Sequence, residues 1–82
     1  MKESFSNTAR KALRKMDRAV AERILAGIDG LHEIPPKGDI KEMQGSPAGR
    51  RRLRVGGYRV IYRISEDTLE ILDIGPRGDI YK

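Results

Sequence analysis

The chain has 82 residues, no cysteine, and a formal net charge of +5 from 17 lysines and arginines against 12 aspartates and glutamates. This length fits one small domain, expected over residues 1–82, and the lack of cysteine excludes both disulfides and thiolate metal sites. No run approaches the roughly 18 apolar residues of a membrane span, and no apolar signal-peptide core follows the first residues, so we expect a cytoplasmic protein without a membrane partner.

In chain order, the first expected elements are an edge strand at residues 2–5 and two antiparallel helices. The first helix covers residues 8–16, where apolar residues recur on one helical face, and Ser6 or Asn7 is its candidate N-cap. Asp17 is a second candidate cap, and the apolar spacing from Val20 to Leu31 predicts a longer helix that ends before Pro35. Gly27 weakens this helix but permits close approach to a neighbour.

Beyond the two prolines, the apolar residues recur with period two, which is typical of strands. Residues 52–55 and 58–64 flank Gly56-Gly57, a pair suited to a hairpin turn, and residues 68–74 follow a turn at 65–67. The expected fold is therefore α+β, with two antiparallel helices packed on a three- to four-stranded antiparallel sheet. Tyr58 and Tyr62 belong to the apolar set and are expected to pack in the core or on the sheet.

The interval between Met43 and Ser65 contains no aspartate or glutamate. It holds six arginines: Arg50, Arg51, Arg52, Arg54, Arg59 and Arg63. Side chains two residues apart share a strand face, so Arg50, Arg52 and Arg54 should form one row. The hairpin should bring Arg59 near this row. Guanidinium groups bind phosphate through bidentate hydrogen bonds. A solvated sheet face is the alternative, but six like charges without an acid favour an anionic partner.

Two motifs frame this block. They read Arg-Leu-Arg-Val-Gly-Gly-Tyr-Arg-Val-Ile-Tyr-Arg at residues 52–63 and Ile-Gly-Pro-Arg-Gly-Asp-Ile-Tyr at 74–81, with shorter matches at 31–35 and 41–45. Together they resemble the RelE family of the RelE/ParE toxin superfamily. The resemblance implies two helices on an antiparallel sheet and a toxin that cleaves messenger RNA without metal or cofactor, typically in the ribosomal A site. It also implies a cognate antitoxin, expected to be an acidic, partly disordered segment that wraps the toxin.

The resemblance also implies the site residues. The matching catalytic positions are Arg50, Arg52, Arg59, Arg77 and Tyr81. In family terms, the 2′-hydroxyl of the RNA attacks the adjacent phosphate, while arginines stabilise the developing charge. Many relatives carry lysine where this chain has Arg50 and Arg52. Arginine is a poor base, so Tyr81 is the leading proton acceptor, or it stacks on a base. Arg51, Arg54 and Arg63 are expected to help dock RNA or the ribosome.

Other polar residues are interpreted as structural. His32 is the only histidine and is expected to interact with carbonyls at a helix end. Six carboxylates are read as solvated surface without a metal site: Asp17, Glu22, Asp29, Glu33, Asp73 and Asp79. Two alternative functions stay open, a DNA gyrase poison of the sister ParE branch and a non-catalytic basic module that binds RNA or ribosomes.

Overall fold

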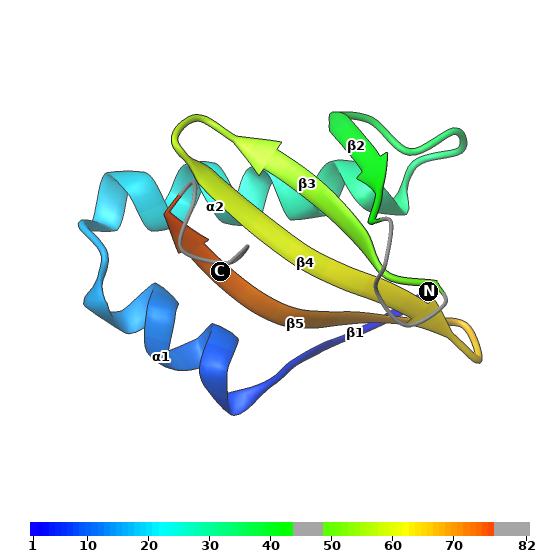
Figure 1. Ribbon diagram of the computed structural model, residues 1–82, viewed down its shortest axis with the longest axis horizontal. Coiled ribbons are helices and arrows are strands. Elements are labelled where there is room, and N and C mark those ends of the chain that lie inside the picture. Colours follow the sequence, from blue (N-terminus) through cyan, green and yellow to red (C-terminus); the bar gives the residue numbers. More distant parts are fainter. Residues whose placement is uncertain (44–48, 77–82) are drawn as a thin grey trace.

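A computed structural model of the chain describes residues 1–43 and 49–76. The elements are β1 (Lys2–Phe5), α1 (Asn7–Lys15), α2 (Arg18–Asp29), the 3₁₀ turn η1 (Gly30–His32), β2 (Asp39–Glu42), β3 (Arg51–Val55), β4 (Tyr58–Ser65) and β5 (Thr68–Pro76). The strands form one sheet in the order β1-β5-β4-β3-β2, with β4 at its centre (Figure 1). The expected α+β class is confirmed, although the described sheet has five strands.

The two edge strands account for the difference in strand number. The expected edge strand at residues 2–5 is present and pairs parallel with β5, whereas all other pairs are antiparallel. β2 was not predicted, because it has only four residues and Ile40 is its single half-buried side chain. A strand this short and exposed has too little apolar alternation to be recognised.

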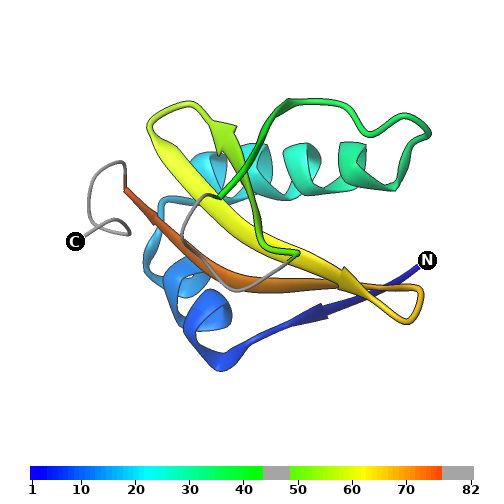
Figure 2. The ribbon, with the colours of Figure 1, turned by 45° about the vertical axis from the view of Figure 1, so that its right-hand side comes forward.

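Both helices cover the same face of the sheet (Figures 1 and 2). Ser6 caps α1, since its Oγ accepts a hydrogen bond from the Ala9 N–H at 3.0 Å, whereas Asp17 precedes α2 without a side-chain cap bond. α1 packs on β5 and α2 packs on β3, and the helices have little contact with each other. The sheet therefore holds each helix separately. None of the described helices is long and apolar enough to cross a membrane.

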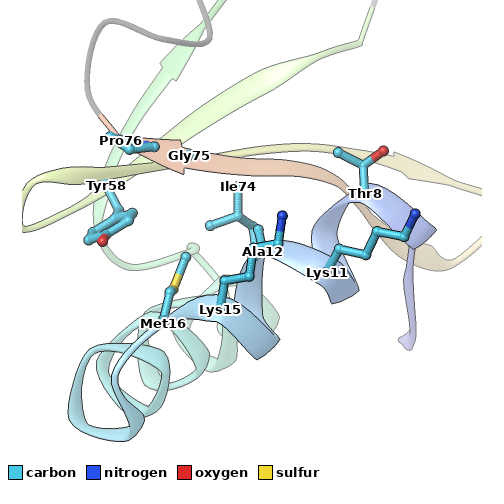
Figure 3. A pocket seen from close by; sticks show the side chains of 9 residues that line it. All are labelled: Thr8, Lys11, Ala12, Lys15, Met16, Tyr58, Ile74, Gly75 and Pro76. Atoms are coloured by element: carbon cyan, nitrogen blue, oxygen red, sulfur yellow. The ribbon is translucent and has the colours of Figure 1, made fainter.

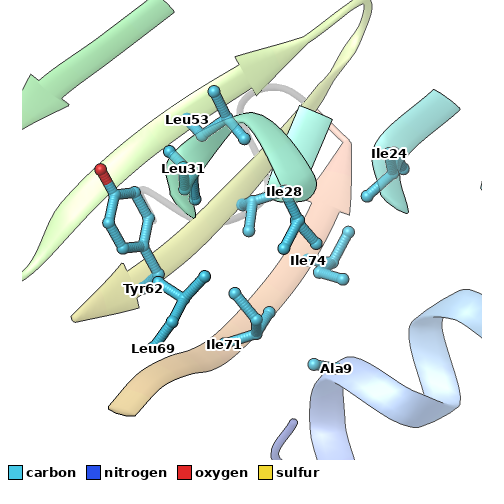
Figure 4. Close-up of a cluster of buried hydrophobic side chains, with 10 residues drawn as sticks. Ala9, Ile24, Ile28, Leu31, Leu53, Tyr62, Leu69, Ile71 and Ile74 are labelled. Carbon is cyan, nitrogen blue, oxygen red and sulfur yellow. The ribbon is translucent and has the colours of Figure 1, made fainter. Parts of the chain in front are cut away.

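One apolar core fills the space between the helices and the sheet (Figure 4). Its fully buried larger side chains are Ile24, Ile28, Leu31, Leu53, Val60, Tyr62, Leu69 and Ile71. This confirms that Tyr62 is a packing residue, and half-buried Tyr58 packs against the same cluster. A Cβ on Gly27 would lie 2.8 Å from Val55 Cγ2, so glycine lets α2 approach β3 closely, as expected.

The turns between the three central strands follow the sequence pattern. Gly56 has φ +58°, a left-handed conformation that suits the β3–β4 hairpin. Glu66 and Asp67 connect β4 to β5 with φ values of 50° and 61°. Both predicted turns are confirmed, and they fix which residues of β3, β4 and β5 lie opposite one another.

Candidate active site

The face of the sheet turned away from the described helices carries most of the arginine block. Val60 and Tyr62 point into the core, so by strand alternation Arg59, Ile61 and Arg63 point to the opposite side. The same alternation applies in β3, where Leu53 is in the core. We call this surface the arginine face and define it by Arg52 and Arg54 of β3, Arg59, Ile61 and Arg63 of β4, and Arg50 just before β3.

Cross-strand pairing brings the arginines of the hairpin together. Arg54 lies directly opposite Arg59, and Arg52 lies directly opposite Ile61. The expectation that the Gly56-Gly57 turn places Arg59 beside the arginines of β3 is therefore confirmed. Ile61 is only 4% exposed although it is not part of the core cluster. Ile61 is therefore a buried apolar residue that lies between the charged side chains of this face.

The expectation of an arginine cluster without compensating acids is wrong. Asp39 of β2 lies between two arginines of β3, with Oδ1 3.3 Å from Arg52 Nη2 and Oδ2 3.9 Å from Arg54 Nε. Glu42 and Glu70 reach two further arginines of the hairpin, Arg51 and Arg63. These acids come from outside the interval 43–65, because β2 and β5 flank the hairpin in the sheet. Sheet pairing thus supplies counter-charges that the linear sequence does not suggest.

The arginines at the expected catalytic positions differ in their surroundings. Arg52 is only 5% exposed, and its ion pair with Asp39 fixes its guanidinium. Arg50 is half-buried, and its Nε has no hydrogen-bond acceptor among the residues that the structure describes. Arg59 is half-buried on the central strand. A buried donor without an acceptor is unfavourable, so a bound phosphate would stabilise Arg50.

Arg51 has a different environment from its neighbours. Its strand position is opposite Tyr62, on the side of the sheet that faces the helices. Burial raises the pKa of the Tyr62 phenol, and the hydrogen-bonded, positively charged Arg51 guanidinium lowers it in part. Arg51 Nη2 also lies 3.8 Å from Glu42 Oε1. Arg51 therefore ties the end of the core to β2, and its part in docking RNA remains a prediction.

His32 has a structural contact, but not the one expected. Its Nε2 lies 2.7 Å from Glu3 Oε2, which joins η1 to β1, so it contacts a strand carboxylate instead of helix-end carbonyls. Within residues 1–43 and 49–76, no group of three or more histidines and acids is placed to hold a metal ion.

Two of the expected catalytic residues, Arg77 and Tyr81, lie outside the described residues. The last described residue, Pro76, is opposite Tyr58, and Gly75 before it is opposite Arg59.

Two acids near the arginine face were missed from the sequence. Asp39 received no role, and no local signal could have found it, because its contacts depend on the pairing of β2. Asp73 was interpreted as solvated surface, yet it is half-buried in β5 and lies opposite Ile61. Its orientation depends on an irregularity in the strand, which sequence alternation does not reveal.

A second feature is a groove of about 450 Å³ between α1 and the adjoining ends of β4 and β5 (Figure 3). Apolar atoms of Ala12, Met16 and Ile74 line it, together with Tyr58 and Pro76. Lys11 and Lys15 lie one helical turn apart along the groove and are exposed. The groove therefore combines an apolar floor with positive charge, on the side of the sheet that carries the helices.

Comparison with known proteins gives consistent matches along almost the whole chain. The family model described as the ParE toxin of the type II toxin-antitoxin system, parDE, matches residues 4–81. Toxin RelG of Mycobacterium tuberculosis is 31% identical over 80 residues, which cover 95% of this chain and 92% of RelG.

Solved structures give the same result. A chain of the archaeal RelE-RelB complex from Pyrococcus horikoshii is 30% identical with a TM-score of 0.77, and the match covers 95% of this chain and 96% of that one. A chain of the RelB-RelE antitoxin-toxin complex from Methanococcus jannaschii is 28% identical with a TM-score of 0.75, and the coverage is 94% and 93%.

Proposed function

The chain belongs to the ParE toxin family of type II toxin-antitoxin systems, within the RelE/ParE superfamily, and from this premise we propose that it is a cytoplasmic messenger-RNA endoribonuclease. Cleavage takes place on the ribosome, needs no metal, and stops translation. The site consists of Arg50, Arg52, Arg59, Arg77 and Tyr81. Arg51, Arg54 and Arg63 add contacts to RNA or the ribosome.

One observation carries the proposal. Arg52 and Arg54 of β3 lie beside Arg59 of β4 on the face that the described helices leave open, with Arg54 and Arg59 directly opposite each other. Like charges opposite each other in a sheet are unfavourable by themselves. Asp39 offsets part of this repulsion, and an RNA phosphate bound between the guanidiniums would offset it further.

The reaction uses the 2′-hydroxyl of the RNA as its nucleophile. Its attack on the adjacent phosphate builds negative charge on the phosphorus oxygens, and fixed guanidiniums stabilise that charge. Arg59 and Arg77 contact these oxygens, while Arg50 and Arg52 hold the phosphate in place. Asp39 keeps the buried Arg52 oriented. The products are a 2′,3′-cyclic phosphate and a 5′-hydroxyl. Arginine is a poor proton acceptor, so another group must take the 2′ proton.

The test is cleavage of a message on purified ribosomes, with RNA 5′ ends mapped at nucleotide resolution. The wild-type chain should cut the message, and both Arg77→Ala and Tyr81→Ala, which removes the phenol and the stacking ring together, should abolish cutting. Arg10→Ala serves as the matched control, because Arg10 is an exposed cation on α1, which packs on the opposite side of the sheet. Intact message with the wild-type chain would contradict the endoribonuclease, and full activity in both variants would contradict the site.

A poison of DNA gyrase is the second candidate function. It is favoured by the family model, which describes the ParE toxin. The ParE branch generally lacks the combined set of basic residues and the terminal tyrosine, which is why cleavage of RNA ranks first. Inducing the chain in cells separates the two, because gyrase poisoning yields broken DNA with intact message.

We further infer that the partner of this toxin is an acidic antitoxin. The archaeal matches are complexes of RelE with RelB. The groove between α1 and the sheet fits an amphipathic segment, whose apolar side chains would cover Met16 and Tyr58 and whose acids would meet Lys11 and Lys15. A disordered segment can extend from this groove and cover the arginine face as well.

Binding of the acidic product of a neighbouring gene tests this inference. Lys11→Glu together with Lys15→Glu should weaken binding and reduce relief of toxicity. Lys37→Glu is the control, since Lys37 lies away from the groove and pairs with Glu33. Equal affinity of all three proteins would contradict docking in the groove, and no binding by any of them would contradict the partner.

A further inference from the structure

The ladder between β4 and β5 contains a bulge that changes the direction of one acid. Ile61 lies opposite Asp73, but the next residue, Tyr62, lies opposite Ile71, which leaves Leu72 as an extra residue in β5. Ile71 and Ile74 both point into the core. Strict alternation from Ile71 would place Asp73 on the core side as well, so the bulge turns its carboxylate onto the arginine face.

The bulge is held by bonds from a distant part of the chain. Ser6 Oγ donates to the carbonyl oxygen of Leu72 at 2.6 Å, and the Ser6 N–H donates to the carbonyl oxygen of Ile71 at 2.9 Å. The same Ser6 Oγ accepts from the Ala9 N–H and so caps α1. Ser6 thus connects the start of α1 to the bulge in β5. These bonds fix the orientation of Asp73, which follows the bulge.

The Asp73 carboxylate differs from the other acids on this face. Asp39 and Glu70 each form ion pairs with arginines of the hairpin. Asp73 forms no ion pair with any residue in the described ranges, and its Oδ1 accepts the Ile74 N–H at 2.8 Å. This bond fixes the carboxylate through Oδ1, and no described residue forms a hydrogen bond with Oδ2. The side chain is half-buried, so it is both held in place and accessible.

The position of Asp73 places it within the proposed site. It is directly opposite Ile61, one row along the sheet from Arg59, whose own partner is Gly75. Diagonal neighbours of this kind in antiparallel strands are separated by roughly 7–8 Å, a span that one phosphate with its ribose hydroxyl can bridge. On the far side of Ile61 lies Arg52. Asp73, which has no ion pair within residues 1–43 and 49–76, therefore lies on the same face as Arg52 and Arg59, with Ile61 between them.

We propose that Asp73 is a catalytic residue that accepts the proton of the attacking 2′-hydroxyl, an inference that rests on the proposed endoribonuclease. The 2′ proton passes to Oδ2 as the bond from the 2′ oxygen to phosphorus forms and the bond from phosphorus to the 5′ oxygen breaks. The leaving 5′ oxygen takes a proton from water, and Asp73 later returns its proton to solvent. Asp73 supplies what Arg50 and Arg52 cannot, and Tyr81 is then left to stack on a base.

Single-turnover cleavage on programmed ribosomes tests the proposal with two variants. Asp73→Asn keeps an oxygen for the Ile74 N–H but loses most of its ability to take a proton, so the rate should fall about 100- to 10,000-fold. Asp73→Ala should be equally slow and should recover at least part of its rate when formate is added. Glu70→Gln is the control, because Glu70 lies on the same strand and pairs with Arg63, and it should stay within about threefold of wild type.

Formate rescue separates chemistry from folding, since a small carboxylate cannot restore a chain that has lost its structure. A 5′-bridging phosphorothiolate message provides the second arm, because its sulfur leaves without a proton. Asp73→Asn should remain slow on this substrate. The proposal is overturned by a wild-type rate in Asp73→Asn, by lack of formate rescue in Asp73→Ala, or by full recovery with the sulfur leaving group. Lack of cleavage by the wild-type chain would overturn the endoribonuclease itself.

Discussion

The two faces of the sheet are built from the same strands but obey different rules. On the helix-covered face, Leu53, Val60 and Ile71 are buried in one apolar core, where contact with any neighbour of the right shape is favourable. On the arginine face, the buried Arg52 depends on one specific partner, Asp39. The apolar contacts of the first face are non-directional and tolerate substitution by residues of similar shape. The ion pairs of the second face require particular partners in a particular geometry. Strand alternation therefore places the residues that stabilise the fold on one side of the sheet and the residues of the proposed site on the other.

Truncating a core residue should have the largest effect, and it should act on stability. Ile71→Ala removes side-chain atoms from a fully buried site, so the free energy of unfolding should fall by about 2–5 kcal/mol. Urea denaturation measures the change. Ile64→Ala is the control, because Ile64 is 46% exposed and should cost far less. Equal losses in both variants would mean that burial in the core does not decide the cost of truncation.

Removing an arginine from the centre of the arginine face should act on activity instead. Arg59→Ala should lower the cleavage rate about 100- to 1,000-fold, equivalent to roughly 3–4 kcal/mol of transition-state stabilisation, with little change in urea unfolding. Arg63→Ala is the matched control on the same strand face, where the arginine pairs with Glu70 near the end of β4. A rate loss as large in the control would mean that general positive charge, and not position, drives the reaction.

Asp39 should affect both stability and activity, because its carboxylate pairs with the buried Arg52 of the proposed site. Asp39→Asn deprives the buried Arg52 of its counter-charge, so the free energy of unfolding should fall by about 1–3 kcal/mol and activity should fall with it. Glu42→Gln is the control from the same strand. Its carboxylate is 82% exposed and pairs with the exposed Arg51, so the change should stay below about 0.5 kcal/mol.

The smallest expected effect lies in the hairpin turn that aligns the two arginine strands. Gly56→Ala should cost about 1–2 kcal/mol, because Gly56 has φ +58° and an alanine there is strained even in open space. Gly57→Ala should be nearly neutral, since Gly57 also faces open space and needs no left-handed backbone. Thermal unfolding compares the pair. Equal shifts would show that the turn does not require this conformation.

Much of the fold follows from local pattern. Helical spacing, the Ser6 cap, period-two alternation and the Gly56-Gly57 pair predicted both helices, three central strands and the tyrosine packing. These signals are readable because each depends on neighbours within a few residues. The same alternation predicted that the arginines of β3 share a face, and the hairpin then brought Arg59 beside them.

Only the tertiary structure decided which charges meet. Asp39 reaches Arg52 because a short, exposed strand joins the edge of the sheet, and Asp73 faces the arginines because a bulge held by Ser6 changes the register of β5. The Asp39–Arg52 contact and the orientation of Asp73 both depend on pairing between segments that are far apart in sequence. The free energy of this pairing is distributed over the whole sheet. Local periodicity determined where the arginines point, and long-range register decided which acids stand beside them.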